Sequence, residues 1–462
     1  MSEANTVERD RLLVANRGEI ACRIIAAARR IGLPVVSVFS DADAGLSHVR
    51  LADAAERIGP APAQESYLNI DAILAAARKH TCNLIHPGYG FLAENPRFAE
   101  ACAEAGLTFV GPSAEHIRLM GDKRNARAAA LEAGVPVLPG SDRLAEGAER
   151  EAAADIGFPL LVKAVAGGGG HGMQRVDEPD ALPAVAERLR GFAQRAYGDD
   201  GIYLERFLPR ARHVEVQVFG FGDGRALHLY ERDCSLQRRH QKLIEEAPAP
   251  ALPADVQREM TGVAVRLAER LAYAGAGTVE FLYDPASESF YFLEMNTRIQ
   301  VEHPVTEMIL GEDLVTAQLR LAMGRDVGLT QGDLCVSGVA IEARLYAENP
   351  QKRFLPSPGR LERLRLPKGD GIRCDSGYRE GDEITAHYDP LIAKIIAHGS
   401  TRQQAIAMLS NALKDTEVEG VRSNRDFLIA LINDDAFGRA DHHTRFVEES
   451  GQLAPAAKKA TR

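Results

Sequence analysis

Two glutamates, Glu280 and Glu294, are placed by the sequence where like charges ordinarily avoid each other. They lie in two strand-like runs, 278–284 and 290–296, and the five-residue connection between the runs suits a β-hairpin. If the last residue of the first run pairs with the first residue of the second, the two glutamates stand directly opposite, with Cβ atoms about 5 Å apart. Such a pair needs a cation between its carboxylates, and oxygen ligands favour a hard divalent ion such as Mg²⁺.

Polar side chains continue at every second residue beyond this hairpin. An extended chain would point all of them to one side. The five residues are Glu294, Asn296, Arg298, Gln300 and Glu302. A solvated strand face gives the same alternation, but five mixed donors and acceptors that follow an opposed glutamate pair favour a binding site.

A glycine-rich loop that follows Lys163 could hold phosphate. The segment 159–173 is PLLVKAVAGGGGHGM, so the lysine ends a buried strand and five glycines lie just beyond it. Glycine lets successive backbone N–H groups approach a phosphate, and the lysine adds a positive charge. The Walker pattern is absent, and we expect the chain to leave the loop as a strand. A hinge would give the same glycine run, but Lys163 favours phosphate.

A basic segment is the third candidate. ERDCSLQRRHQKLIEE places Arg238, Arg239, His240 and Lys242 between acidic residues. A surface ion-pair network and a site for phosphate or bicarbonate both remain open. Two loops favour the anion site. HPGYGFLAEN is too rich in glycine and proline for the interior of a helix or strand, and MGDK supplies another lysine.

The hydrophobic pattern predicts the scaffold for these candidates. Up to about residue 120, short apolar runs alternate with helical stretches, which predicts a doubly wound parallel sheet. No GxGxxG follows the first strand, so a dinucleotide site is not favoured. Residues 213–310 alternate as antiparallel strands do, and Thr401 with Gln404 forms a capping box before a helix. The fold class is therefore α/β combined with α+β.

Composition limits the class of protein. A chain of 462 residues with 45% apolar and 26% charged residues is typical of a globular protein of roughly two to four domains. The net charge of −10 argues against nucleic acid as the main partner. Apolar stretches fall short of the roughly 18 residues of a membrane span. Without a signal-peptide core or a C-x-x-C pair, we expect a cytoplasmic protein with reduced thiols.

Together these residues closely resemble biotin carboxylase, the ATP-grasp subunit or domain of biotin-dependent carboxylases. The resemblance covers about residues 10–450 and rests on ANRGEIA, HPGYGFLAEN, MGDK, the glycine loop, ERDCSLQRRHQK, EEAPAP and EMNTRIQVEHPVTE. Within the family, EARLYAENP and residues 381–394 are most similar to acyl-CoA carboxylase α subunits of the methylcrotonyl or propionyl kind. This implies ATP-dependent carboxylation of biotin by bicarbonate, through carboxyphosphate, as the first half-reaction of an acyl-CoA carboxylase.

The resemblance also implies an ATP-grasp fold, its cofactors and its partners. The expected domains are an N-terminal α/β domain at 1–122, an ATP-grasp domain at 123–335 with a mobile lid at about 139–212, an antiparallel C-terminal domain at 336–450, and a tail or linker at 451–462. ATP and Mg²⁺ or Mn²⁺ are the expected cofactors. Because Met-Lys, the centre of a biotin-attachment sequence, occurs nowhere, biotin is expected on a separate carrier protein or domain. The other expected partners are a carboxyltransferase subunit and a second copy of the chain, with no nucleic acid and no membrane.

A role for each candidate residue follows from the resemblance. The nucleotide-binding residues would be Lys123, Lys163, Gly169, Gly170, Glu205, Arg206, Phe207, Leu208, His213 and His240. The metal ions would be organised by Glu280, Glu294 and Asn296. Bicarbonate would be held by Lys242, Arg298, Gln300 and Val301. Glu302 would be the general base, and Arg344 would stabilise the enolate-like ureido oxygen of biotin.

Two residues depart from the family pattern. His171 stands in the glycine loop where Arg or Lys is usual, which predicts a phosphate contact that depends on pH. Arg206 replaces a usual lysine.

Two alternative functions stay open. Another ATP-grasp carboxylate–amine or carbamoyl ligase would not be expected to carry QRRHQK and RIQVEHPVTE together. A catalytically silent nucleotide-binding subunit would be expected to have lost Glu302, Arg298 or Lys242.

Overall fold

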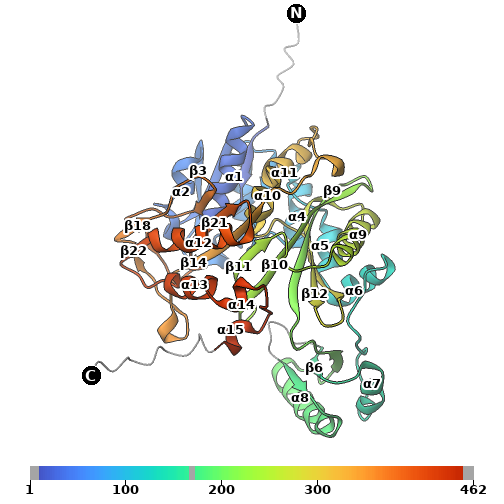
Figure 1. The fold of residues 1–462 in the computed structure, drawn as a ribbon. Helices are drawn as coiled ribbons and strands as arrows, with labels where there is room; N and C mark the ends of the chain where they lie inside the picture. Colours follow the sequence, from blue (N-terminus) through green and yellow to red (C-terminus); the bar gives the residue numbers. More distant parts are fainter. Residues whose placement is uncertain (1–9, 166–171, 451–462) are drawn as a thin grey trace, which may run out of the picture.

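The N-terminal part of the chain is a five-stranded parallel sheet with helices on both faces (Figure 1). The computed structural model describes residues 10–165 and 172–450. The strands lie in the order β3-β2-β1-β4-β5. Their bounds are β1 Leu12–Val14, β2 Val35–Ser40, β3 Ala54–Gly59, β4 Leu84–His86 and β5 Thr108–Phe109. Their helices are α1 Gly18–Arg30, α2 Ser47–Leu51, α3 Ile70–Lys79, α4 Pro96–Glu104 and α5 Ala114–Gly121.

The doubly wound arrangement follows from strand alternation. Leu12 of β1 packs in one core with Ile20 and Ile24 of α1, whereas its neighbour Leu13 packs in a second core with Ile73 of α3. Successive side chains of a strand point to opposite faces, so a short apolar strand needs a helix on each side. The predicted parallel sheet is confirmed.

The centre of the molecule is an eight-stranded antiparallel sheet in the order β13-β12-β9-β10-β11-β14-β21-β19. The bounds are β9 Arg212–Phe221, β10 Ala226–Arg238, β11 Gln241–Ala247, β12 Ala274–Asp284, β13 Ser289–Asn296, β14 Val339–Tyr346, β19 Ile372–Ser376 and β21 Leu391–Gly399. Strand β11 pairs with β14, so one sheet continues across position 335. Antiparallel strands beside the parallel sheet confirm the predicted mixture of α/β and α+β.

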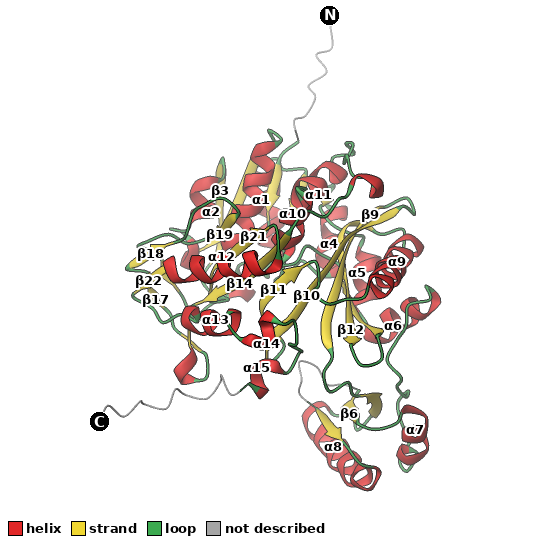
Figure 2. Cartoon of the chain, in the orientation of Figure 1, coloured by secondary structure: helices red, strands yellow, loops and turns green. Residues whose placement is uncertain are grey.

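Helices cover the faces of this sheet, as Figure 2 shows in red around the yellow strands. They are α9 Ala254–Arg270, α10 His303–Leu310, α11 Leu314–Ala322, α12 Arg402–Asp415, α13 Arg425–Ile432, α14 Asp435–Gly438 and α15 Phe446–Glu449. Helix α12 begins where predicted, and Thr401 Oγ1 accepts a hydrogen bond from the backbone N–H of Gln404 at 3.2 Å. The return bond of the capping box goes from Ser400, not Thr401, to the Gln404 side chain. None of the helices in the described ranges is long and apolar enough to cross a membrane.

A small three-stranded sheet projects from the body (Figure 1). It contains β6 Leu160–Ala164, β7 Met173–Val176 and β8 Ile202–Arg206, packed with α7 Glu149–Ile156 and α8 Leu182–Tyr197 around a core of its own. Helix α6, Lys123–Glu132, precedes it. As predicted, the chain continues as a strand, β7, directly after the glycine run. Gly169, Gly170 and His171 lie outside the described residues.

The remaining elements are short. Paired strands are β15 Glu348–Asn349 with β16 Leu355–Pro356, β17 Gly359–Arg360 with β20 Glu383–Ile384, and β18 Arg363–Arg365 with β22 Glu417–Glu419. The 3₁₀ turns are Asp41–Asp43, Ala63–Glu65, Pro179–Ala181, Gln331–Asp333 and Pro350–Lys352.

Candidate active site

Four side chains meet on one face of the antiparallel sheet, and we call them the Lys242 cluster. Lys242 Nζ, on β11, lies 2.5 Å from Glu215 on β9, 3.1 Å from Glu280 on β12 and 2.6 Å from Glu302, which precedes α10. Burial opposes the lysine charge, but Cys234 and the three carboxylates raise the pKa of Lys242 well above its usual range. The ammonium group therefore stays charged and holds the carboxylates together.

The opposed glutamate pair is present, although its register differs in one detail. Glu280 lies directly opposite Glu294, as predicted. Asp284 pairs with Ser289, however, so the predicted pairing of Asp284 with Phe290 is wrong. A register shift between Glu280 and Phe281 compensates for this difference. A β-bulge of this kind inserts one extra residue on one strand, which the alternation of side chains alone does not reveal.

The two carboxyl groups of the pair have different surroundings. Glu280 is buried and accepts hydrogen bonds from Asn296 Nδ2 and Gln300 Nε2, each at 2.8 Å. Burial opposes ionisation of Glu280, but Lys242 and His213 lower its pKa far below the usual range. Glu294 is the exposed member. Although the residue as a whole is exposed, neighbouring protein atoms desolvate its carboxyl group. This desolvation and the charge on Glu280 raise the pKa of Glu294. Two opposed carboxyl groups, one of which is harder to ionise because of the other, suit a divalent cation, which would favour the ionised form of both.

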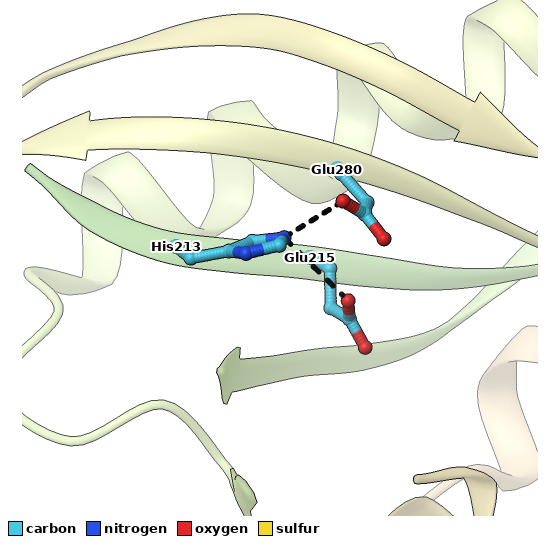
Figure 3. A group of neighbouring side chains, drawn as sticks. All are labelled: His213, Glu215 and Glu280. Carbon is cyan, nitrogen blue, oxygen red and sulfur yellow. Dashed lines mark ion pairs between the residues drawn. The ribbon is translucent and has the colours of Figure 1, made fainter. Parts of the chain in front are cut away.

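His213 joins the same face from β9 (Figure 3). Its Nε2 lies 2.9 Å from Glu280 and 3.8 Å from Glu215. Burial would lower the pKa of His213, but Glu280 raises it above the usual value. The three residues bring nitrogen and carboxylate ligand atoms within 4.8 Å of one another, close enough to hold a metal ion.

Sequence reasoning missed two members of this network, Glu215 and Arg232. The Arg232 side chain is fully buried, and its Nε lies 2.6 Å from Glu215. The same guanidinium donates to side-chain oxygens of four further residues, which are Gln217, Thr278, Gln300 and Thr306. The signal in the sequence for Glu215 was HVEVQV: polar residues at 213, 215 and 217 alternate with valines, and all six residues are buried.

Arg298 connects the site to the parallel sheet. Its Nε lies 3.0 Å from Glu94, in the loop that follows β4, and its Nη2 donates to Asn296 at 2.9 Å. Residues 297–302 do not continue β13 as an extended strand, because the strand ends at Asn296 and the chain turns into α10. The alternating polar residues converge all the same, since Asn296 and Gln300 both reach Glu280.

Glu302 lies between two cations. Oε1 contacts Lys242 at 2.6 Å, and Oε2 contacts Arg344 Nη2, on β14, at 2.9 Å. Burial opposes its charge, but Lys242, Arg344 and Arg232 hold the pKa of Glu302 well below the usual range. Arg344 also contacts Glu245 at 2.5 Å. Burial raises the pKa of Glu245 to about 7, although Arg344 opposes the rise.

Residues predicted for the nucleotide lie mainly on the small sheet. Lys163 on β6 pairs with Glu205 on β8. Arg206 donates to the Ile156 carbonyl at the end of α7, and the backbone N–H of Phe207 donates to the Pro159 carbonyl at 3.0 Å. Leu208 follows directly and is partly exposed. The remaining lysine, Lys123, is exposed at the start of α6, close enough to Glu294 to affect its pKa.

The basic segment splits between the two interpretations. Lys242 enters the cluster, whereas buried Arg238 pairs with Glu348 at 3.0 Å and stacks on Phe354. His240 is exposed in the turn between β10 and β11, where its φ is +66°.

Two cavities flank this region. One of about 410 Å³ is lined by Phe91 and Glu94–Arg97, beside the partner of Arg298. A second of about 480 Å³ lies between α1 and β19 and is lined by neither Lys242 nor Glu302.

Comparisons with known proteins agree with this geometry. Three family models match: "Biotin carboxylase, N-terminal domain" at residues 8–117, "Carbamoyl-phosphate synthase L chain, ATP binding domain" at 122–330, and "Biotin carboxylase C-terminal domain" at 342–449. The chain is 46% identical to "Biotin carboxylase 1" of Bacillus subtilis, over 95% of this chain and 98% of that protein. It is 47% identical to the mouse mitochondrial methylcrotonoyl-CoA carboxylase subunit alpha, of which it spans 62% of the length.

Solved structures are similar over nearly the whole chain. The bicarbonate-bound biotin carboxylase domain of a thermophilic 2-oxoglutarate carboxylase matches with a TM-score of 0.91 and 40% identity, over 96% of this chain and 98% of that one. The Hydrogenobacter thermophilus 2-oxoglutarate carboxylase domain dimer, in complex with MgADP, ADP and bicarbonate, matches with a TM-score of 0.88 and 41% identity, over 97% and 99%.

Proposed function

Because the chain belongs to the biotin carboxylase family, we propose that it carboxylates biotin with bicarbonate at the expense of ATP. The observation that carries the proposal is the Lys242 cluster with Arg298 and Arg344. Glu302 is an ionised carboxylate held between Lys242 and Arg344, and an anionic substrate needs such cations for binding. Carbamoyl ligases share the ATP-binding family model, but the N- and C-terminal models that flank it are those of biotin carboxylase.

Lys123, Lys163 and the glycine loop, including Gly169 and Gly170, would bind the phosphates of ATP. Residues 205–208 would hold the adenine largely through the backbone, with His213 and His240 beside the nucleotide. Support comes from Lys163 and Glu205, which form an ion pair between the neighbouring strands β6 and β8 of the small sheet. Since that sheet has a core of its own, it can close over the nucleotide as one body and exclude water.

Glu280, Glu294 and Asn296 would hold the divalent cation. The fit rests on the opposed carboxyls, one ionised and one with a raised pKa. Bound there, Mg²⁺ would neutralise phosphate charge as it develops. The protein's own part is to fix the carboxylates: Gln300 and Asn296 each donate to Glu280 and so set the direction of its oxygens.

Lys242, Arg298, Gln300 and Val301 would bind bicarbonate, and Glu302 would take its proton. The low pKa of Glu302 keeps it deprotonated until bicarbonate binds, and a bicarbonate that draws Lys242 or Arg344 away from the carboxylate would make it a stronger base. Bicarbonate oxygen then attacks the γ-phosphorus of ATP, giving carboxyphosphate and ADP. Carboxyphosphate breaks down to CO₂ and phosphate, and phosphate removes the N1′ proton of biotin. Arg344, 2.9 Å from Glu302, would stabilise the negative ureido oxygen that results.

We further propose that biotin arrives on a separate carrier, that a carboxyltransferase uses the product, and that the acceptor is an acyl-CoA. The similarity to the methylcrotonoyl-CoA carboxylase alpha subunit supports the acyl-CoA assignment. The dimeric 2-oxoglutarate carboxylase domain supports a homodimer. The proposed domains are 1–122, 123–335 with its lid at about 139–212, and 336–450.

The test is ATP cleavage by the purified chain with Mg²⁺ and bicarbonate, with and without free biotin. We expect biotin to stimulate cleavage and removal of bicarbonate to abolish the stimulation. Glu302→Gln should lose biotin-dependent cleavage and retain ATP binding. The matched control is Glu246→Gln, because Glu246 is also a buried glutamate and is paired with a cation, Arg402. Its neighbour on β11, Glu245, contacts Arg344 in the site, so Glu246 points to the opposite face of the sheet. Biotin-dependent turnover by Glu302→Gln would contradict the proposed base.

A further inference from the structure

Lys394 is a lysine with no solvent exposure that the reaction outlined above does not use. It lies on β21, and its Nζ donates to the backbone carbonyl of Val301 at 2.8 Å. The same ammonium group lies 2.9 Å from Glu19 on α1. One charge thus joins the parallel sheet's first helix, the turn before α10 and the C-terminal part of the antiparallel sheet. A buried ammonium group is costly unless every partner is in place.

The register of the sheet aligns Lys394 with Arg344. The two residues stand directly opposite on β21 and β14, so their side chains leave the same face. Arg344 contacts the carboxylate of Glu302, and Lys394 contacts the carbonyl of the residue before it. Two cations on neighbouring strands therefore hold two consecutive residues, one by its side chain and the other by its main chain.

Carboxyl groups around Lys394 balance its charge. Burial opposes ionisation, but Glu19, Glu342 and Asp375 raise the pKa of Lys394 above its usual value. Glu342 differs from the other two, because burial raises its own pKa well above the usual range and neither of its oxygens has a hydrogen-bond partner among the described residues. Asp375 is shared with Arg373, at 2.7 Å. Lys394 is charged, and Glu19 is its nearest counter-ion.

We propose that Lys394 is a positioning residue that fixes the Val301–Glu302 peptide for bicarbonate binding. The inference rests on the proposed function. A carbonyl held by a charged donor cannot rotate freely, so the peptide plane that leads into Glu302 is set before substrate arrives. Arg344 then needs to fix only the Glu302 side chain. Reactive groups need placement to within about half an ångström, and the two contacts restrain both the main chain and the side chain of this segment.

The rival explanation is that Lys394 only balances the charge of Glu19. Two variants separate the explanations: Lys394→Met, which removes the donor and leaves Glu19 unpaired, and Lys394→Met/Glu19→Gln, which removes the donor and the unpaired charge together. After Glu19→Gln, the side-chain amide oxygen can still accept from the Tyr89 hydroxyl, the other partner of Glu19. Arg402→Met is the matched control, since it removes a partly buried cation from the buried Glu246 in the same part of the chain without touching Val301.

Biotin-dependent ATP cleavage is measured for each variant as bicarbonate and ATP are varied separately. We expect the KM for bicarbonate to rise at least about tenfold in both Lys394 variants, the loss expected for one charge-assisted hydrogen bond. The KM for ATP should stay within about twofold, because Val301 and Glu302 lie away from the small sheet. Arg402→Met should keep the wild-type KM for bicarbonate. A double variant with wild-type bicarbonate KM, or a parallel rise in both KM values, would overturn the proposal.

Hydrogen exchange supplies a measurement that does not depend on turnover. Amides of residues 302–310 should exchange at least about tenfold faster in the double variant than in wild type, and at the wild-type rate in Arg402→Met. If the wild-type protein shows no bicarbonate-dependent ATP cleavage, the proposed function is refuted. The exchange rates would still decide whether Lys394 fixes the Val301–Glu302 peptide. Unchanged exchange in the double variant would refute that role.

Discussion

Replacing Arg232 with methionine removes the most densely hydrogen-bonded cation of the site. The side chain is fully buried and contacts five side chains on four different segments. Removing one partner of a buried ion pair costs about 3–5 kcal/mol. Glu215 keeps Lys242 at 2.5 Å after the change, so we expect a value near the lower end, about 3 kcal/mol.

The assay is hydrogen exchange of β9 and β12 peptides, because a chain of several domains does not unfold in one step. A loss of about 3 kcal/mol accelerates exchange on the order of 100-fold where opening is at equilibrium. The second half of the test is a cycle with Glu215→Gln. Since the two residues are in direct contact, the double variant should be less destabilised than the sum of the singles by about 1–3 kcal/mol.

Arg402→Met again serves as the comparison. Its guanidinium also pairs with one buried carboxylate, Glu246, but its side chain is 13% exposed, so water can replace part of the lost contact. We expect it to accelerate exchange less than Arg232→Met. Additive effects of Arg232→Met and Glu215→Gln, or equal acceleration by Arg402→Met, would refute the view that this buried network holds the catalytic strands together.

Two further predictions concern acidic residues. The pKa of Glu245 is raised from 4.5 to about 7 in the folded protein, so the folded state holds a proton that the unfolded chain has released. The free energy of opening β11, which carries Glu245, should therefore fall as pH rises from 5 to 8, by up to about 3 kcal/mol relative to Glu245→Gln; equal pH profiles of the hydrogen-exchange free energies of β11 peptides in the two proteins would contradict this. Glu280→Gln should raise the Mg²⁺ concentration for half-maximal ATP cleavage at least about tenfold, whereas Glu246→Gln should not. A titration that leaves the Mg²⁺ requirement of Glu280→Gln unchanged would remove Glu280 from the metal site.

The parts of the site that sequence could predict are local ones. Glu280 and Glu294 belong to one hairpin, so alternation and a short connection were enough to place them opposite each other, although the bulge after Glu280 was missed. The convergence of Asn296 and Gln300 on Glu280 also followed from alternation, even though the strand ends early.

The residues that were missed were hidden for two different reasons. Arg232 and Glu215 stand opposite each other in the hairpin of β9 and β10, but a register shift between His228 and Glu231 breaks the simple alternation along it. Lys394 on β21 meets Val301, in the turn before α10, across a separation of 93 residues, and such a contact leaves no mark in the local sequence. In both cases a buried charged residue looks like an exposed one until its partners are known. The roles of Lys242 and Glu302 came from the family resemblance, and the structure shows the contact that unites them.

The continuity of the antiparallel sheet has a consequence for how the chain is made. Four residues of β11, from Ile244 to Ala247, pair with β14, which is synthesised much later. Until β14 emerges, β11 is an open edge with unpaired N–H and C=O groups and an apolar Leu243–Ile244 step, the kind of surface that invites pairing with another chain. A chain cut at residue 335 would keep that edge permanently, and we expect such a fragment to aggregate even though its own helices and strands are complete.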